Sequence, residues 1–137
     1  MTDILLVDDD EDSCLLLAEL LALQGETLRT AHDGEEALKL LDERFPSVVV
    51  SDIEMPRLDG PAMIYRMFVK DLGRENIPII FLSGRQDLAK IAHAVGTPYY
   101  LCKPFDLAEL TKLIGRAVAE AIPPRPDDSF SSLVSRH

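Results

Sequence analysis

The stretch Val48-Val49-Val50-Ser51-Asp52 gives the clearest indication of the fold. Three β-branched residues in a row predict a strand that is buried on both faces, as strands are in parallel sheets. Four further apolar runs predict strands at residues 4–7, 28–31, 79–82 and 99–102. The run at 28–31 is the more polar one, which favours a place at the edge of the sheet.

Longer amphipathic stretches alternate with these runs. They predict helices at residues 15–23, 62–72, 87–95 and 106–122, and a further helix that opens after Asp33. Asp33 with Glu36, and Asp106 with Glu109, have the spacing of capping boxes, in which the glutamate reaches back to the N-cap. Because strands and helices alternate throughout, we expect an α/β fold with a parallel sheet and helices on both faces.

Composition limits the class of protein. With 137 residues and 47% hydrophobic residues, the chain has room for one globular domain with its own core. No apolar run is long enough to span a membrane, and no secretory leader is visible, so we expect a cytoplasmic protein. The net charge of −10 argues against nucleic-acid binding by this chain. Cys14 and Cys102 lie far apart, and we expect free thiols, with one disulfide as the alternative.

Polar residues follow four of the predicted strands. Asp8 and Asp9 follow the first strand, and Asp52 follows the third. Ser83 follows the fourth strand and Lys103 the fifth. Because ligands bind beyond the carboxyl ends of the strands in open parallel sheets, we expect these side chains to converge.

Three converging carboxylates repel one another, by about 4 kcal/mol per pair at a separation of about 4 Å and an effective dielectric near 20. Raised pKa values, exposure to solvent or a bound cation could each offset this repulsion. Carboxylate oxygens suit a hard cation, and Mg²⁺ is the typical one. A cation, the ammonium of Lys103 and the hydroxyl of Ser83 around one carboxylate suit a tetrahedral dianion. The residues themselves therefore indicate phosphoryl transfer to or from an aspartate.

Four segments that carry these residues resemble a known family. They are Leu6-Val7-Asp8-Asp9, Ser51 to Gly60, Leu82-Ser83-Gly84 and Cys102-Lys103-Pro104-Phe105. In this order and at these strand ends they look like the motifs of bacterial two-component response regulator receiver domains, the CheY-like family. The resemblance covers residues 3–122. It implies a flavodoxin-like (βα)5 fold with strand order 2-1-3-4-5.

The resemblance also implies roles for single residues. Asp52 is then the phosphoacceptor and Asp9 a direct Mg²⁺ ligand, with Mn²⁺ as an alternative ion. Asp8 binds the ion directly or through water, and the backbone carbonyl of Glu54 is a further ligand. Lys103 contacts the phosphoryl oxygens, and its peptide bond to Pro104 is expected to be cis.

The family also has a switch. Ser83 stands at the position whose hydroxyl moves to the phosphoryl group, and Tyr100 at the aromatic position that turns inward with it. Because Tyr99 and Tyr100 point to opposite faces of a strand, Tyr99 is the alternative. Met55-Pro56 and Asp59-Gly60 are expected to shape the loop after the acceptor strand.

Two charged residues flank the expected site. Glu54 lies two residues after Asp52, and Arg85 lies two residues after Ser83. We hypothesise that they form an ion pair across the mouth of the site, which hinders water and slows dephosphorylation. The alternative is two independent surface charges, since exposed ion pairs contribute only about 0–1 kcal/mol.

The implied function is a signalling switch rather than an enzyme. A histidine kinase, a phosphotransfer protein or a small donor such as acetyl phosphate supplies the phosphoryl group. His32, His93 and His137 have no metal-binding spacing, so the donor histidine belongs to another protein. Phosphorylation then changes affinity for a protein target or an output domain through the fourth helix, fifth strand and last helix. No membrane or nucleic-acid partner is expected.

Two other functions are compatible with these residues. A Mg²⁺-dependent phosphatase or phosphotransferase resembling the haloacid-dehalogenase family would also form an aspartyl phosphate. Such enzymes place a second aspartate two residues after the nucleophile, where this chain has Glu54. A receiver that has lost its chemistry and serves as a binding scaffold is the third interpretation.

The composition changes after residue 122. Pro123-Pro124-Arg125-Pro126-Asp127-Asp128-Ser129 predicts a linker or loose tail through residue 137. We therefore expect a receiver domain at 1–122 and a flexible segment at 123–137. The chain is either a single-domain unit or the front part of a longer one, and its start at Met1 argues against the end of a hybrid kinase.

Overall fold

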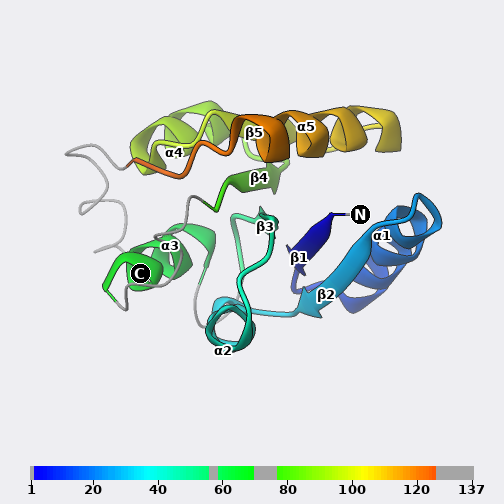
Figure 1. Cartoon of the computed structure of the whole chain (residues 1–137). Helices are drawn as coiled ribbons and strands as arrows, with labels where there is room; N and C mark the ends of the chain where they lie inside the picture. The colour runs from blue at the N-terminus through cyan, green and yellow to red at the C-terminus, as the bar shows by residue number, and fades with distance from the viewer. Residues whose placement is uncertain (1, 56–58, 70–76, 126–137) are drawn as a thin grey trace.

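The computed structural model describes residues 2–55, 59–69 and 77–125. Strands and helices alternate along these residues (Figure 1). The elements are β1 (Asp3–Val7), α1 (Glu11–Leu23), β2 (Thr27–Ala31), α2 (Gly34–Glu43), β3 (Val48–Asp52), α3 (Gly60–Val69), β4 (Ile79–Ser83), α4 (Leu88–Val95), β5 (Tyr99–Cys102) and α5 (Leu107–Glu120).

The five described strands form one parallel sheet in the order β2-β1-β3-β4-β5 (Figure 1). This is the order implied by the resemblance, and β2 lies at an edge as its polar sequence predicted. β1, β3 and β4 lie inside the sheet, and every residue of β3 and β4 is buried. Their near-continuous apolar sequences reflect burial on both faces.

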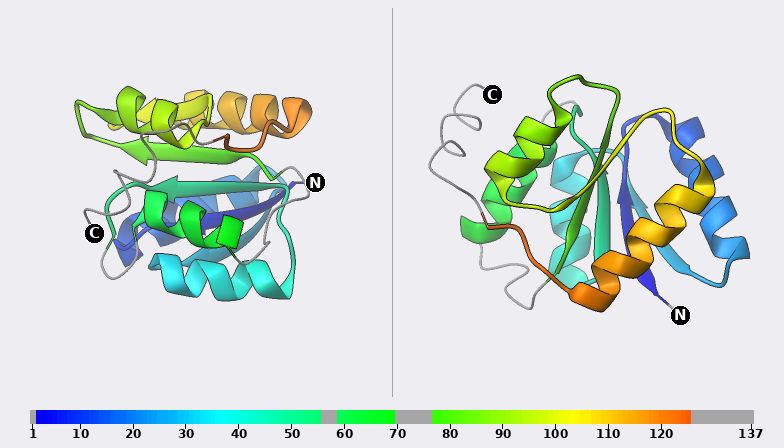
Figure 2. Two further views of the ribbon diagram at one scale, coloured as in Figure 1. Left: turned by 90° about the vertical axis from the view of Figure 1, so that its left-hand side faces the viewer. Right: turned by 90° about the horizontal axis from the view of Figure 1, so that it is seen from above.

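Two apolar cores lie on the two faces of the sheet. One contains buried residues of α2, α3 and α4 against β-strand residues such as Val49 and Phe81. The other contains buried residues of α1 and α5 against Ile4, Val50 and Tyr99. Figure 2 shows α2 and α3 side by side on one face. The sheet is thus covered on both sides, which leaves the edge at the strand ends for polar side chains.

Helix boundaries differ from the predictions at several ends. α1 begins at Glu11 rather than residue 15, because the Asp10 carboxylate caps the helix and accepts N–H groups of Asp12 and Ser13. α5 ends at Glu120 rather than 122, because Ala121 has a left-handed backbone with φ 52°. The predicted end of the third helix, at 72, lies outside the described residues.

One capping box differs in detail. The Asp33 carboxylate accepts the N–H of Glu36 at 2.8 Å, as predicted. The Glu36 carboxylate, however, accepts the N–H of His32 at 3.1 Å, one residue before the N-cap. In α5 the Glu109 carboxylate accepts the N–H of the N-cap Asp106 at 3.1 Å.

The first part of the predicted loose tail is packed. Pro124 is buried, and the N–H of Arg125 donates to the carbonyl of Gly96 at 3.1 Å. Residues 123–125 therefore lie against the domain. The rest of that segment lies outside the described residues.

The two cysteines differ in their exposure to solvent. Cys14 is buried and Cys102 is exposed, and both are free thiols. Burial raises the pKa of Cys14 to about 11, with nearby carboxylates such as Asp8 adding to the effect. Within the described parts of the chain, each helix is too short or too polar to cross a lipid bilayer.

Candidate functional site

The strand register brings the polar residues to one edge of the sheet. Val7 pairs with Ser51, Asp52 with Leu82, and Ser83 with Cys102. The residues that follow these pairs therefore lie beside one another, although they are far apart in sequence. This confirms the expected convergence of the first, third, fourth and fifth strand ends.

Three carboxylates form the centre of the site. Asp8, Asp9 and Asp52 each place a carboxylate oxygen within 4.8 Å of the other two. Asp8 and Asp52 are each only 8% exposed, whereas Asp9 is exposed. For Mg²⁺, which binds oxygens at about 2.1 Å in an octahedron, neighbouring ligand oxygens lie roughly 3–4 Å apart. The three carboxylates therefore fit a small divalent cation.

Lys103 contacts the middle carboxylate directly. Its Nζ lies 2.6 Å from Oδ1 of Asp52. The N–H of Lys103 donates to the carbonyl of Ser83 at 2.9 Å, which fixes the start of the loop after β5 beside β4. The Lys103–Pro104 peptide bond is cis, as the resemblance implied.

The electrostatics of Asp52 reflect this crowding. Burial, followed by the neighbouring carboxyl group of Asp8, raises the pKa of Asp52 above its ordinary value, while Lys103 acts to lower it. Burial is the largest influence on the pKa of Lys103 and acts to lower it, but the hydrogen bond to Asp52 and the negative charges of Asp52, Asp8 and Asp9 together raise the pKa overall. Lys103 therefore stays positively charged, and the cluster still holds more negative charge than one ammonium neutralises.

An open cavity of about 680 Å³ lies over this cluster. Its lining includes six of the residues predicted from the sequence: Asp9, Asp52, Glu54, Ser83, Arg85 and Lys103. Ser83 is 7% exposed, and its Oγ accepts the N–H of Arg85 at 3.1 Å. The hydroxyl proton of Ser83 thus remains available for an acceptor in the cavity.

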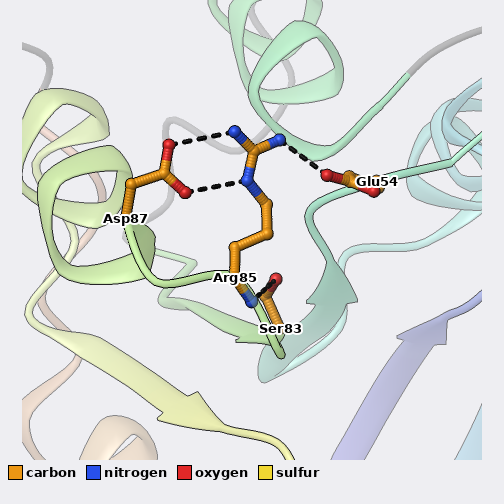
Figure 3. A network of polar contacts seen from close by, with 4 residues as sticks. All are labelled: Glu54, Ser83, Arg85 and Asp87. Carbon is orange, nitrogen blue, oxygen red and sulfur yellow. Dashed lines mark hydrogen bonds and ion pairs between the residues drawn. The ribbon is translucent and has the colours of Figure 1, made fainter.

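Arg85 joins the two sides of the cavity mouth (Figure 3). Its Nη1 lies 2.7 Å from Oε1 of Glu54, as the hypothesis of an ion pair expected. Its Nε and Nη2 donate to the two carboxylate oxygens of Asp87 at 2.8 and 2.9 Å. This bidentate contact lowers the pKa of Asp87.

Asp87 is the functional candidate that sequence reasoning missed. It occupies the N-cap position of α4, where an aspartate is ordinarily explained as a helix cap. Here its carboxylate binds Arg85 instead of the first turn of the helix. The spacing of Arg85 and Asp87, two residues apart in one loop, was the available signal.

The remaining predicted residues are the two tyrosines of β5 and the residues of the loop after β3. Tyr99 is fully buried, whereas Tyr100 is 41% exposed, so the two tyrosines do face opposite sides. Gly60 begins α3 in close contact with β3 and β4, since an added Cβ would lie 2.8 Å from both the Asp52 carbonyl and the Phe81 ring. Met55 is partly buried against the core, and Pro56 lies outside the described residues.

His32 lies close to the backbone of the acidic cluster. Nδ1 of His32 lies 3.4 Å from the carbonyl oxygen of Asp8, so His32 sits behind the acidic cluster. His93 is on α4, and His137 lies outside the described residues. The metal-like group among the described residues contains carboxylates and no histidine.

Comparisons with known proteins agree with this geometry. Residues 4–115 match the family model described as response regulator receiver domain. A relative from Leptolyngbya boryana, described as an uncharacterized 14.6 kDa protein in the sodA1 3' region, is 39% identical over 115 residues. That match covers 82% of this chain and 86% of the relative.

Two solved structures illustrate the similarity. A CheY-like response regulator receiver domain protein from Methanospirillum hungatei has 27% identity and a TM-score of 0.77, covering 87% of this chain and 95% of its own. NtrX from Brucella abortus, solved in complex with ATP, has 31% identity and a TM-score of 0.77. That match covers 88% of this chain, which spans only 27% of NtrX. From the family match over most of its length, the strand order and these neighbours, the chain belongs to the response regulator receiver domains, the CheY-like domains of two-component systems.

Proposed function

We propose that Asp52 accepts a phosphoryl group and that the domain acts as a phosphorylation-dependent switch. The donor is a phosphohistidine of a histidine kinase or phosphotransfer protein, or a small molecule such as acetyl phosphate. The observation that carries this proposal is the 2.6 Å contact between Lys103 Nζ and Asp52 Oδ1 within a cluster of three carboxylates. Two free thiols fit a reducing compartment such as the cytoplasm.

The transfer is a nucleophilic displacement at phosphorus. A carboxylate oxygen of Asp52 forms a bond to phosphorus while the phosphorus–nitrogen bond of phosphohistidine breaks. The imidazole leaves with the electron pair and takes up a proton. Lys103 remains beside the acceptor and stabilises the negative charge on the phosphoryl oxygens, so positioning and electrostatics do most of the work.

The donor set at Asp8, Asp9 and Asp52 fits Mg²⁺, with Mn²⁺ as an alternative. Asp9 and Asp52 would hold the ion, together with the Glu54 carbonyl and with Asp8 directly or through water. The bound cation would neutralise charge on the carboxylates and on the incoming phosphoryl group. The raised pKa of Asp52, caused first by burial and then by Asp8, supports this assignment, since Lys103 supplies one positive charge to a cluster of three carboxylates.

The switch involves the residues beside the acceptor. Ser83 donates its hydroxyl proton to the phosphoryl group, and Tyr100 turns from its exposed position toward the space that Ser83 leaves. This movement alters the surface formed by α4, β5 and α5, where a target protein or an output domain binds. The half-exposed state of Tyr100 is compatible with the resting position in this scheme.

The Glu54–Arg85 pair is proposed to slow dephosphorylation. It spans the cavity through which water must approach the aspartyl phosphate, and Asp87 holds the guanidinium in place. The same pair counts against the phosphatase alternative. A general acid two residues after the nucleophile must reach the leaving group, whereas the Glu54 carboxylate is bound to Arg85 and exposed.

The test is incubation of the purified chain with acetyl phosphate and Mg²⁺, followed by intact-mass measurement. We expect one phosphoryl group per chain in the native sequence and none in Asp52→Asn. A chain that stays unmodified under these conditions contradicts the proposal. Many turnovers of a generic phosphate ester, without a lasting phosphoprotein, would instead identify a phosphatase.

A further inference from the structure

The chain after α5 turns back over the domain. Ala121 has a left-handed backbone with φ 52°, and its N–H donates to the carbonyl of Ala117 at 2.8 Å. From there the chain runs across to the end of α4, as the orange segment in the right panel of Figure 2 shows. Pro123 is half-buried and Pro124 is buried. We call residues 121–125 the C-terminal strap.

The near end of the strap is held by Tyr99. The Tyr99 hydroxyl donates to Oε1 of Glu120 at 2.8 Å, and the backbone of Ile122 acts to lower the pKa of this hydroxyl. The guanidinium of Arg116 lies 5.1 Å from the centre of the Tyr99 ring, a distance that suits a cation–π contact. β5 and α5 together therefore fix the point at which the strap leaves α5.

The far end of the strap is held by Gly96, the residue that closes α4. The Gly96 carbonyl accepts the N–H of Arg125 at 3.1 Å. Gly96 has φ 82°, and a Cβ at this position would overlap the backbone of Arg125. The absence of a side chain at Gly96 thus permits both the left-handed turn and the close approach of the strap.

Gly25 gives an internal comparison. It follows α1 with φ 89°, and no described atom lies within 4 Å of a Cβ placed there. A glycine after α1 is thus required by its backbone conformation alone. The glycine after α4 is required by its conformation and by the strap.

The strap is connected to the phosphoacceptor cavity through α4. Arg85 lines the cavity and binds Asp87, the N-cap of α4, while Gly96 ends the same helix. α4 has eight residues, so its ends are about 12 Å apart. Because a short helix moves as a rigid body, a displacement that starts beside Ser83 reaches Gly96 and the contact with Arg125.

We propose that the C-terminal strap is a conformational latch, docked on α4 while Asp52 is unmodified and released when phosphorylation moves α4. This inference rests on the proposed function of Asp52. The left-handed conformation of Ala121 is strained for a residue with a side chain, so the docked strap depends on contacts at both ends. Loss of the Gly96 contact frees Arg125 and thereby changes the presentation of whatever follows it in the chain.

Thermodynamic linkage allows the latch to be tested in two ways, by the docking of the strap and by the affinity of the phosphoryl site. If occupation of the phosphoryl site weakens docking of the strap, a variant with a released strap binds a phosphoryl mimic more tightly by the same coupling. Beryllofluoride with Mg²⁺ serves as the mimic, because it occupies the place of a phosphoryl group and binds reversibly. Hydrogen exchange of the Arg125 amide, followed by NMR, reports docking directly.

The first experiment compares the native chain with Gly96→Ala and with its matched control Gly25→Ala. Both variants carry the cost of a left-handed alanine, but only Gly96→Ala displaces the strap. We expect saturating beryllofluoride to speed Arg125 exchange at least about fivefold in the native chain. We also expect Gly96→Ala to exchange rapidly without the mimic and to bind the mimic about fivefold more tightly than Gly25→Ala.

A second pair covers the case in which Gly96→Ala does not fold. Arg125→Pro removes the N–H that donates to Gly96, and Arg125→Ala keeps it. We expect tighter mimic binding in Arg125→Pro alone. The latch would be overturned, and the proposed function left intact, by two results together. The native chain binds the mimic without a change in the exchange rate of the Arg125 amide, and the two variants of each pair bind the mimic with equal affinity. Failure of the native chain to bind the mimic would overturn both.

Discussion

At the scale of single residues, the site depends on the ammonium group of Lys103 beside Asp52. The two groups are 2.6 Å apart, so in the proposed transfer the ammonium would contact the phosphoryl oxygens as charge develops on them. We expect Lys103→Ala to lower the rate of phosphorylation by acetyl phosphate about 100-fold, as for loss of one stabilising donor. The rate is measured by intact mass at fixed times. Lys112→Ala, an exposed position on α5, is the control and should match the native rate.

Arg85 allows a second prediction at the same scale. Arg85→Ala and Glu54→Asn both remove the ion pair across the cavity mouth, and Asp87→Asn weakens the contact that orients Arg85. Because exposed pairs contribute up to about 1 kcal/mol, we expect the aspartyl phosphate to decay about two- to fivefold faster in each variant. The decay is followed after removal of the donor. Lys90→Ala on α4 is the control, and unchanged lifetimes in all three variants would exclude the role.

The residues of the site were largely predictable because of where they stand in the chain. The apolar sequence of a buried strand makes it recognisable, and in a parallel sheet the first few polar residues after it lie at the functional edge. Asp9, Asp52, Ser83 and Lys103 follow from that rule. Asp87 did not, because an aspartate before a helix has a local explanation that hides its partner across the loop.

At the scale of elements, two glycines in helices make a test of packing. Gly60 begins α3 where a Cβ would lie 2.8 Å from the Asp52 carbonyl, whereas a Cβ on Gly115 in α5 meets no described atom within 4 Å. We expect Gly60→Ala to lower the free energy of unfolding by about 1–3 kcal/mol through overpacking. Gly115→Ala should raise it by up to about 1 kcal/mol through helix propensity. Urea unfolding measures both, and a stabilising Gly60→Ala would contradict the close contact.

Elements were predicted better in their order than in their ends. The strands and helices follow from hydrophobic periodicity, which is a property of local sequence. The start of α1 depends on the Asp10 cap, and the end of α5 on the turn at Ala121. The packed strap could not be predicted, since two adjacent prolines are typical of loose segments and its contacts come from Tyr99 and Gly96, distant in sequence.

At the scale of the whole molecule, metal binding and stability should be linked. The carboxylate cluster exists only when β1 and β3 lie side by side, so a cation that binds it favours the folded state. At a Mg²⁺ concentration 100 times the dissociation constant, we expect about 2.7 kcal/mol of added stability. Thermal unfolding with Mg²⁺ and with a chelator measures the difference. Asp9→Asn should lose most of it, and an equal gain in Asp9→Asn would place the ion elsewhere.

The two outer strands also affect how copies of this molecule meet. β5 is only four residues long, and β2 carries Arg29, whose guanidinium donates to the carbonyls of Leu40 and Arg44 at the end of α2. A short edge strand at β5 and a cationic side chain on the edge strand β2 offer a poor template for pairing with a strand of another chain. We therefore expect crowded solutions of this domain to form few intermolecular ribbons.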